Sequence, residues 1–170
     1  MDENFRVDRK HINNVRKCII RHIDMDCAVN QNGTRHTKEG IIMLIDEAFD
    51  KFKYILYTPG GGNIPLIVVL HGSGEIGSSL SKLKKREPYL SLKSGKCAPD
   101  AVVLMPQLPK STWGEYKAAL KELIDHVAEE NGCDVKRISI TGHSLGANGT
   151  LDMLLAYPDF FSAASVLSPC

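Results

Sequence analysis

The sequence lacks the features that mark membrane, nucleic-acid-binding and disulfide-rich proteins. Its 170 residues contain no apolar run near the roughly eighteen residues of a membrane span. The net charge is only +1, and the basic run at residues 82–86 is short, so neither nucleic acid nor an anionic membrane is indicated as a partner. Five scattered cysteines without a C-x-x-C pair argue against a disulfide framework or a zinc site.

Motifs for bound ions, phosphates and export are also missing. The acidic pair Asp24-x-Asp26 is followed by Ala28 at the next ligand position and has no closing glutamate, which excludes a calcium loop. No G-K-[ST] stretch, the signature of a P-loop, is present. The N-terminus is polar and acidic, unlike a secretory signal. We therefore expect a cytoplasmic protein, and the sequence implies no metal and no organic cofactor.

The most informative stretch is a glycine-bracketed serine between an apolar strand and a helix. Residues 138–140 alternate like a buried strand, Gly142-x-Ser144-x-Gly146 follows, and leucines then recur at helical spacing until residue 157. A strand that turns abruptly into a helix strains the residue at the apex, and glycines remove the side chains that would collide there. The pattern predicts a nucleophile elbow that presents the Ser144 hydroxyl; the alternative is an unrelated Gly/Ser turn.

A second motif lies after a strand that is apolar on both faces, residues 65–70, as expected in the middle of a parallel sheet. The following His71-Gly-Ser-Gly-Glu loop offers exposed amides, and acyl transfer needs two N–H donors for its oxyanion. We predict an oxyanion hole formed by the N–H of Leu145 with that of Ser73 or Gly74. His71 is interpreted as a hydrogen-bonded structural residue rather than a base.

The remaining segments complete an alternating pattern of strands and helices. Strands are predicted at 52–58, 101–106 and 162–167, and an amphipathic helix at 116–127 carries His126 off its apolar face, as a solvated residue. Gln107 and Trp113 follow a strand at the edge where ligands bind in open α/β sheets, so both are candidate substrate-binding residues. Packing under a loop is the equal alternative for Trp113.

The first fifty residues predict a β-ribbon extension. Apolar residues alternate over 18–29, Asn32-Gly33 is a hairpin turn signal, and a second apolar run covers 41–45. We therefore divide the chain into this ribbon, residues 1–50, and a core at residues 51–170.

The order of these motifs resembles the α/β-hydrolase superfamily, and more narrowly its esterase, depolymerase-type and prolyl-oligopeptidase-like members with an H-G-x-G-E oxyanion loop. The resemblance covers about two thirds of the chain, from residue 53 onward. It implies a doubly wound, mostly parallel, three-layer α/β sheet. It also implies a serine hydrolase, most simply a carboxylic-ester hydrolase, acting on a small-molecule ester or acyl substrate through an acyl-enzyme on Ser144.

One departure from that family concerns the base. The family order is serine, acid, histidine, yet no histidine follows Ser144 here, and the downstream acids Asp152 and Asp159 come too early. His143 adjoins the serine, where neighbouring side chains diverge. The chain is then an N-terminal, C-terminally truncated piece of a hydrolase, a protein completed by another subunit, or a non-catalytic binding or assembly scaffold. An uncovered sheet edge would favour homo-oligomers.

Overall fold

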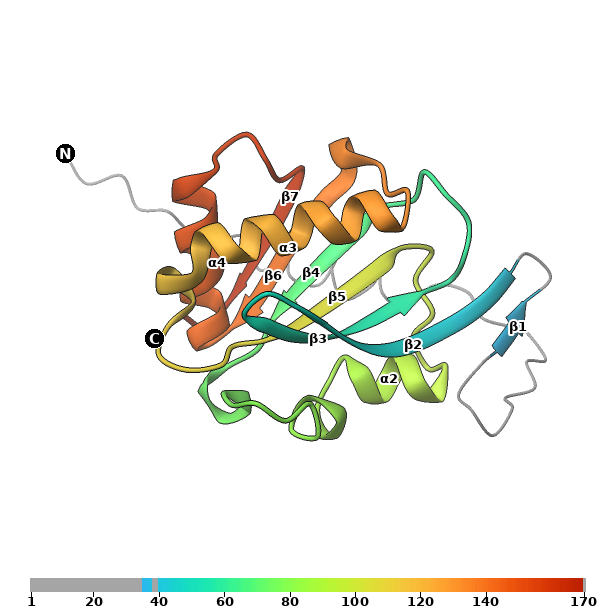
Figure 1. Ribbon diagram of the computed structural model, residues 1–170, viewed down its shortest axis with the longest axis horizontal. Helices are drawn as coiled ribbons and strands as arrows, with labels where there is room; N and C mark the ends of the chain where they lie inside the picture. The colour runs from blue at the N-terminus through green and yellow to red at the C-terminus, as the bar shows by residue number, and fades with distance from the viewer. Residues whose placement is uncertain (1–34, 38–39, 170) are drawn as a thin grey trace.

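The computed structural model describes residues 35–37 and 40–169, which form one twisted sheet flanked by helices (Figure 1). Within these residues the sheet has seven strands in the order β1-β2-β3-β5-β4-β6-β7. The strands are β1 (Arg35–Thr37), β2 (Gly40–Phe49), β3 (Phe52–Thr58), β4 (Leu66–Leu70), β5 (Val102–Gln107), β6 (Ile138–His143) and β7 (Ala163–Leu167). The helices are α2 (Tyr89–Ser94), α3 (Lys117–Glu130) and α4 (Leu145–Ala156), with short 3₁₀ turns η1 (Ser73–Glu75), η2 (Leu83–Lys85), η3 (Trp113–Tyr116) and η4 (Val135–Arg137).

Strand β4 lies at the centre of the parallel part of the sheet. It pairs in parallel with β5 on one side and β6 on the other, and β6 pairs in parallel with β7. Strands β3, β2 and β1 continue the sheet beyond β5 with antiparallel pairing. The expectation that the apolar run at 65–70 is a central strand is confirmed, because helical layers on both faces exclude water from it.

Two apolar clusters, one on each face of the sheet, give the predicted three layers. Figure 1 shows α3 and α4 on one face and α2 on the other. The larger cluster joins Phe52, Leu66 and Val68 to buried residues of α3 such as Leu120 and Leu123. On the opposite face, alternate strand residues pack against η2 and α2; they are Ile55, Tyr57, Val103 and Met105, in contact with Leu83, Tyr89 and Leu92.

Helix α3 follows the expected apolar stripe and ends before Gly132, whose φ is +56°. The predicted solvation of His126 is wrong in detail. Its ring is half-buried and stacks on Phe49, with ring centroids 4.3 Å apart. The sequence spacing could not show this contact, because Phe49 belongs to a strand far from α3 along the chain.

The described part of the N-terminal extension belongs to the same sheet as the core. The predicted apolar run at 41–45 lies in β2, which pairs with β3 from Met43↔Thr58 to Phe49↔Phe52. The expected strand at 18–29, the turn at Asn32-Gly33 and the Asp24-x-Asp26 stretch lie outside the described residues. The division of the chain at residue 50 stays a prediction.

The closest approach between layers occurs where α4 begins, behind the end of β4. A Cβ added to Gly146 would overlap the carbonyl oxygen of Leu70 and would lie 2.7 Å from that of His71. A Cβ on Gly142 would overlap the carbonyl of Gly146. Both glycines are thus required by backbone contacts, which cannot move aside as a flexible side chain can.

We expect Gly146→Ala to lower the free energy of unfolding by about 3 kcal/mol or more, because the new methyl group is forced into backbone atoms of β4. Urea denaturation followed by circular dichroism measures the change. Gly74→Ala is the matched control, since nothing lies within 4 Å of a Cβ at that position. Equal midpoints for the two variants would contradict the packing described.

Candidate active site

Ser144 occupies a sharp turn between the end of β6 and the start of α4. Its φ of 54° and ψ of −121° fall in a region that residues with a side chain rarely adopt. Its hydroxyl caps no helical amide, and it has no hydrogen-bond partner within the described part of the chain. The Ser144 N–H donates to the carbonyl of Leu167 at 2.9 Å, which ties the turn to β7. The backbone therefore holds this hydroxyl in a strained position without using it structurally.

The glycine-rich loop after β4 lies directly beside this turn. A Cβ placed on Gly72 would lie 3.6 Å from the Cβ of Ser144 and 3.5 Å from the carbonyl oxygen of His143. Ser73 and Gly74, which follow in the 3₁₀ turn η1, are exposed. The structure thus brings together the two motifs that the sequence singled out, from positions some seventy residues apart.

Three predicted donors have free amides at this junction. Among the described residues, the N–H groups of Leu145, Ser73 and Gly74 make no hydrogen bond. Leu145 is the first residue of α4, where a helical N–H lacks an intrahelical acceptor and the helix dipole favours negative charge. Unpaired donors of this kind suit an anion developing near Ser144.

Side chains from the end of β5 and from η3 hold the loop in place. The Gln107 Nε2 donates to the carbonyls of Glu75 and Ser79, each at 2.9 Å. The Trp113 Nε1 donates to the carbonyl of His71 at 3.1 Å. Gln107 and Trp113 are each only 1% exposed, so the contacts that the structure shows for them are mainly internal. Their predicted contact with substrate stays a prediction.

His71 uses both ring nitrogens within this network. Its Nε2 accepts the N–H of Leu108 at 2.9 Å, so the proton resides on Nδ1, which donates to the carbonyl of Gly72 at 2.6 Å. Burial lowers the pKa of the imidazole below 6.5, although the hydrogen bond to Gly72 and the nearby Glu75 carboxylate oppose this. The ring is therefore neutral and structural, and it has no nitrogen free to accept a proton from Ser144.

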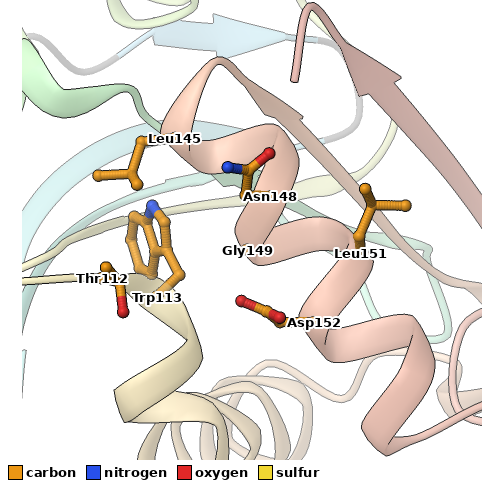
Figure 2. Close-up of a pocket in the computed structure, with 7 residues that line it drawn as sticks. All are labelled: Thr112, Trp113, Leu145, Asn148, Gly149, Leu151 and Asp152. Atoms are coloured by element: carbon orange, nitrogen blue, oxygen red, sulfur yellow. The ribbon is translucent and has the colours of Figure 1, made fainter. Parts of the chain in front are cut away.

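A cavity of about 440 Å³ opens beside α4, on the side that faces η3. Figure 2 shows its lining residues, which are Thr112, Trp113, Leu145, Asn148, Gly149, Leu151 and Asp152. Trp113 packs tightly on α4 at Gly149, where an added Cβ would overlap the indole. Trp113 therefore both packs in the core and lines the cavity next to the candidate oxyanion donor Leu145.

Residues 51–170 match the model of the Esterase family. The chain belongs to this family. No curated protein sequence matches it. Several solved structures nevertheless share its architecture, and they establish the α/β-hydrolase fold predicted from the motifs.

The structure of a thermostable esterase matches the present chain with a TM-score of 0.56 and 24% identity. The match covers 72% of the present chain and 40% of the thermostable esterase. The S-formylglutathione hydrolase FrmB of Staphylococcus aureus matches with a TM-score of 0.60 and 15% identity, over 79% of the present chain and 61% of FrmB. FphF, a fluorophosphonate-binding serine hydrolase of Staphylococcus aureus, matches with a TM-score of 0.59 and 18% identity. That match covers 77% of this chain and 58% of FphF. The chain thus spans 40% to 61% of the length of these structures.

The described part of this esterase-family chain contains no base positioned for Ser144. Both ring nitrogens of His71 are hydrogen-bonded, the His126 ring stacks on Phe49, and the exposed ring of His143 makes no hydrogen bond among the described residues. The same part holds no group of three or more His, Cys, Asp or Glu side chains able to bind a metal ion. None of its helices combines the length and apolar character that crossing a membrane requires.

The buried neutral His71 predicts a pH dependence of stability. Because its folded pKa is lowered, the unfolded chain binds the extra proton first as the pH falls below 6.5. Stability should therefore decline with falling pH, by at most about 1.4 kcal/mol per pH unit for one proton. Urea unfolding at pH 7.5, 6.5 and 5.5 measures how the free energy of unfolding changes with pH. The His71→Phe variant should be less stable, but its free energy of unfolding should depend less on pH. An identical slope in both proteins would contradict the assignment.

Proposed function

We propose that this chain carries the nucleophile and oxyanion hole of a serine esterase. The observation that carries the proposal is the strained Ser144 at the β6–α4 turn, beside the free amides of Leu145 and Ser73. Membership of the Esterase family supports the reaction class. The substrate is a small-molecule carboxylic ester.

In the proposed reaction, the Ser144 Oγ forms a bond to the ester carbonyl carbon and its proton passes to a general base. The N–H groups of Leu145 and Ser73, with Gly74 alongside, stabilise the negative carbonyl oxygen of the tetrahedral intermediate. Collapse breaks the bond to the alcohol oxygen, and the alcohol leaves with the proton. In the second half, the oxygen of a water molecule bonds to the acyl carbon and one of its protons passes to the base. The bond between that carbon and the Ser144 Oγ then breaks, the Oγ takes the proton back from the base, and the acid is released.

The general base comes from outside the residues whose side chains the structure describes. A serine hydroxyl is a weak nucleophile at neutral pH, and loss of a triad member costs about 10⁴ to 10⁶ in rate. A histidine supplied by another part of the protein or by a second subunit would have to approach the exposed side of Ser144.

The second candidate function is a non-catalytic binding or assembly scaffold. It is favoured by one observation, the absence of any hydrogen-bonded base at Ser144 within the described residues. This alternative and the esterase proposal differ in whether Ser144 reacts.

We expect a fluorophosphonate probe to label the wild-type chain once, at Ser144, because the probe phosphorus mimics an acyl carbon under attack. Intact mass and peptide mapping locate the adduct, and Ser144→Ala should remain unlabelled. A folded wild-type chain that does not react at all would contradict the esterase proposal for this chain and support the scaffold.

The same assay examines the oxyanion donor. Ser73→Pro removes the N–H at the first position of a 3₁₀ turn, where proline fits and where no hydrogen bond is lost. Ser73→Ala keeps the N–H and is the matched reference. Labelling of Ser73→Pro should be about a hundredfold slower than that of Ser73→Ala, since a single donor contributes about that factor. Equal rates would exclude the Ser73 amide from the oxyanion hole.

A further inference from the structure

The cavity beside α4 is lined by apolar residues, by the polar residues Thr112 and Asn148, and by a single charged group. Its apolar lining comes from Trp113, Leu145 and Leu151, and the only charged side chain among its lining residues is that of Asp152. Its volume of about 440 Å³ is in the range of small-molecule sites. Figure 2 shows the Asp152 carboxylate pointing from α4 toward Trp113 and Thr112.

The Asp152 carboxylate has no protein partner in the described part of the chain. It forms neither a hydrogen bond nor an ion pair there, although its residue is half-buried. It packs directly on the backbone of η3, where a Cβ on Gly114 would lie 2.7 Å from its Oδ2. A carboxylate that has lost part of its hydration without gaining a partner attracts a cation that can enter the same space.

The cavity also reaches the candidate catalytic turn. Leu145, whose N–H is the candidate oxyanion donor, lines one end, and Asp152 lies seven residues further along the same helix. Seven residues of α-helix correspond to a rise of about 10 Å. Trp113 fills the space against Gly149. An unbranched apolar chain would therefore pass along α4 over Asn148 and place a terminal cation at Asp152.

We propose that this cavity binds an apolar chain that ends in a positively charged amine, with the ammonium group paired to Asp152. For substrate choice the inference rests on the proposed function: the favoured ester carries such an amine at the far end of its acyl or alcohol group. Binding itself does not require Ser144 to react, so the two proposals can fail separately.

Trp113 provides a direct readout of binding. It is the single tryptophan of the chain and it lines the cavity, so a ligand that enters should change its fluorescence. The probes are n-octylammonium, neutral 1-octanol and anionic octanoate, titrated at low ionic strength. We expect n-octylammonium to bind about fivefold more tightly than 1-octanol, as for a partly exposed ion pair, and octanoate to bind most weakly.

Two variants and a salt series assign the preference. Asp152→Asn keeps the shape of the side chain and should bring the affinities for the amine and the alcohol close together. Asp159→Asn removes an exposed carboxylate outside the cavity and should leave the ratio unchanged. In the wild-type chain the ratio should fall as salt is raised. Together these results would support the proposal.

Two results would overturn the proposal whatever the fluorophosphonate assay shows. One is equal affinity of the wild-type chain for n-octylammonium and 1-octanol, and the other is a preference for n-octylammonium that persists in Asp152→Asn. An Asp152-dependent preference in a chain that the fluorophosphonate probe does not label would support the cation site and count against the esterase proposal. If Asp152→Asn fails to fold, the wild-type salt series decides: a preference that does not change with salt would overturn the ion pair.

Discussion

The structure depends on the backbone contact between the first turn of α4 and the ends of β4 and β6. A Cβ on Gly146 would overlap the carbonyls of Leu70 and His71, and a Cβ on Gly142 would overlap that of Gly146, so no side chain fits at either glycine. This contact leaves Ser144 as the one residue that must turn the chain, and its positive φ follows from the packing rather than from its own preference. The hydroxyl makes no hydrogen bond among the described residues, so the strain brings no visible structural gain.

A second set of contacts fixes what lies opposite that serine. The loop after β4 is held by hydrogen bonds from Gln107, Leu108 and Trp113, all supplied by β5 and the segment that follows it. Because these groups are buried, the loop is held rigidly while its own amides at Ser73 and Gly74 stay exposed. Rigid donors that need no reorganisation are those that stabilise a developing oxyanion most effectively. The core thus orders the loop without occupying the groups proposed to act.

Much of this could be read from the sequence because it is local. The strand at 52–58 and the strand-turn-helix around Ser144 follow from periodicity and glycine placement, and the structure shows both. The functions of buried polar side chains could not be predicted in the same way. The Gln107 side chain donates to carbonyls about thirty residues earlier, and the ring of His126 in α3 stacks on Phe49 of β2. Such contacts depend on how the helical layers pack against the sheet. A local sequence pattern does not predict that packing.

Packing holds Ser144 in a backbone conformation that suits glycine, yet the chain keeps a hydroxyl at this position. The most direct test is the difference in the free energy of unfolding between Ser144→Gly and Ser144→Ala. The glycine variant should be more stable by about 1 kcal/mol or more, because glycine relieves the positive φ and alanine retains it. An alanine variant as stable as the glycine variant, or more stable, would mean that the turn is an ordinary helix start and would contradict the account.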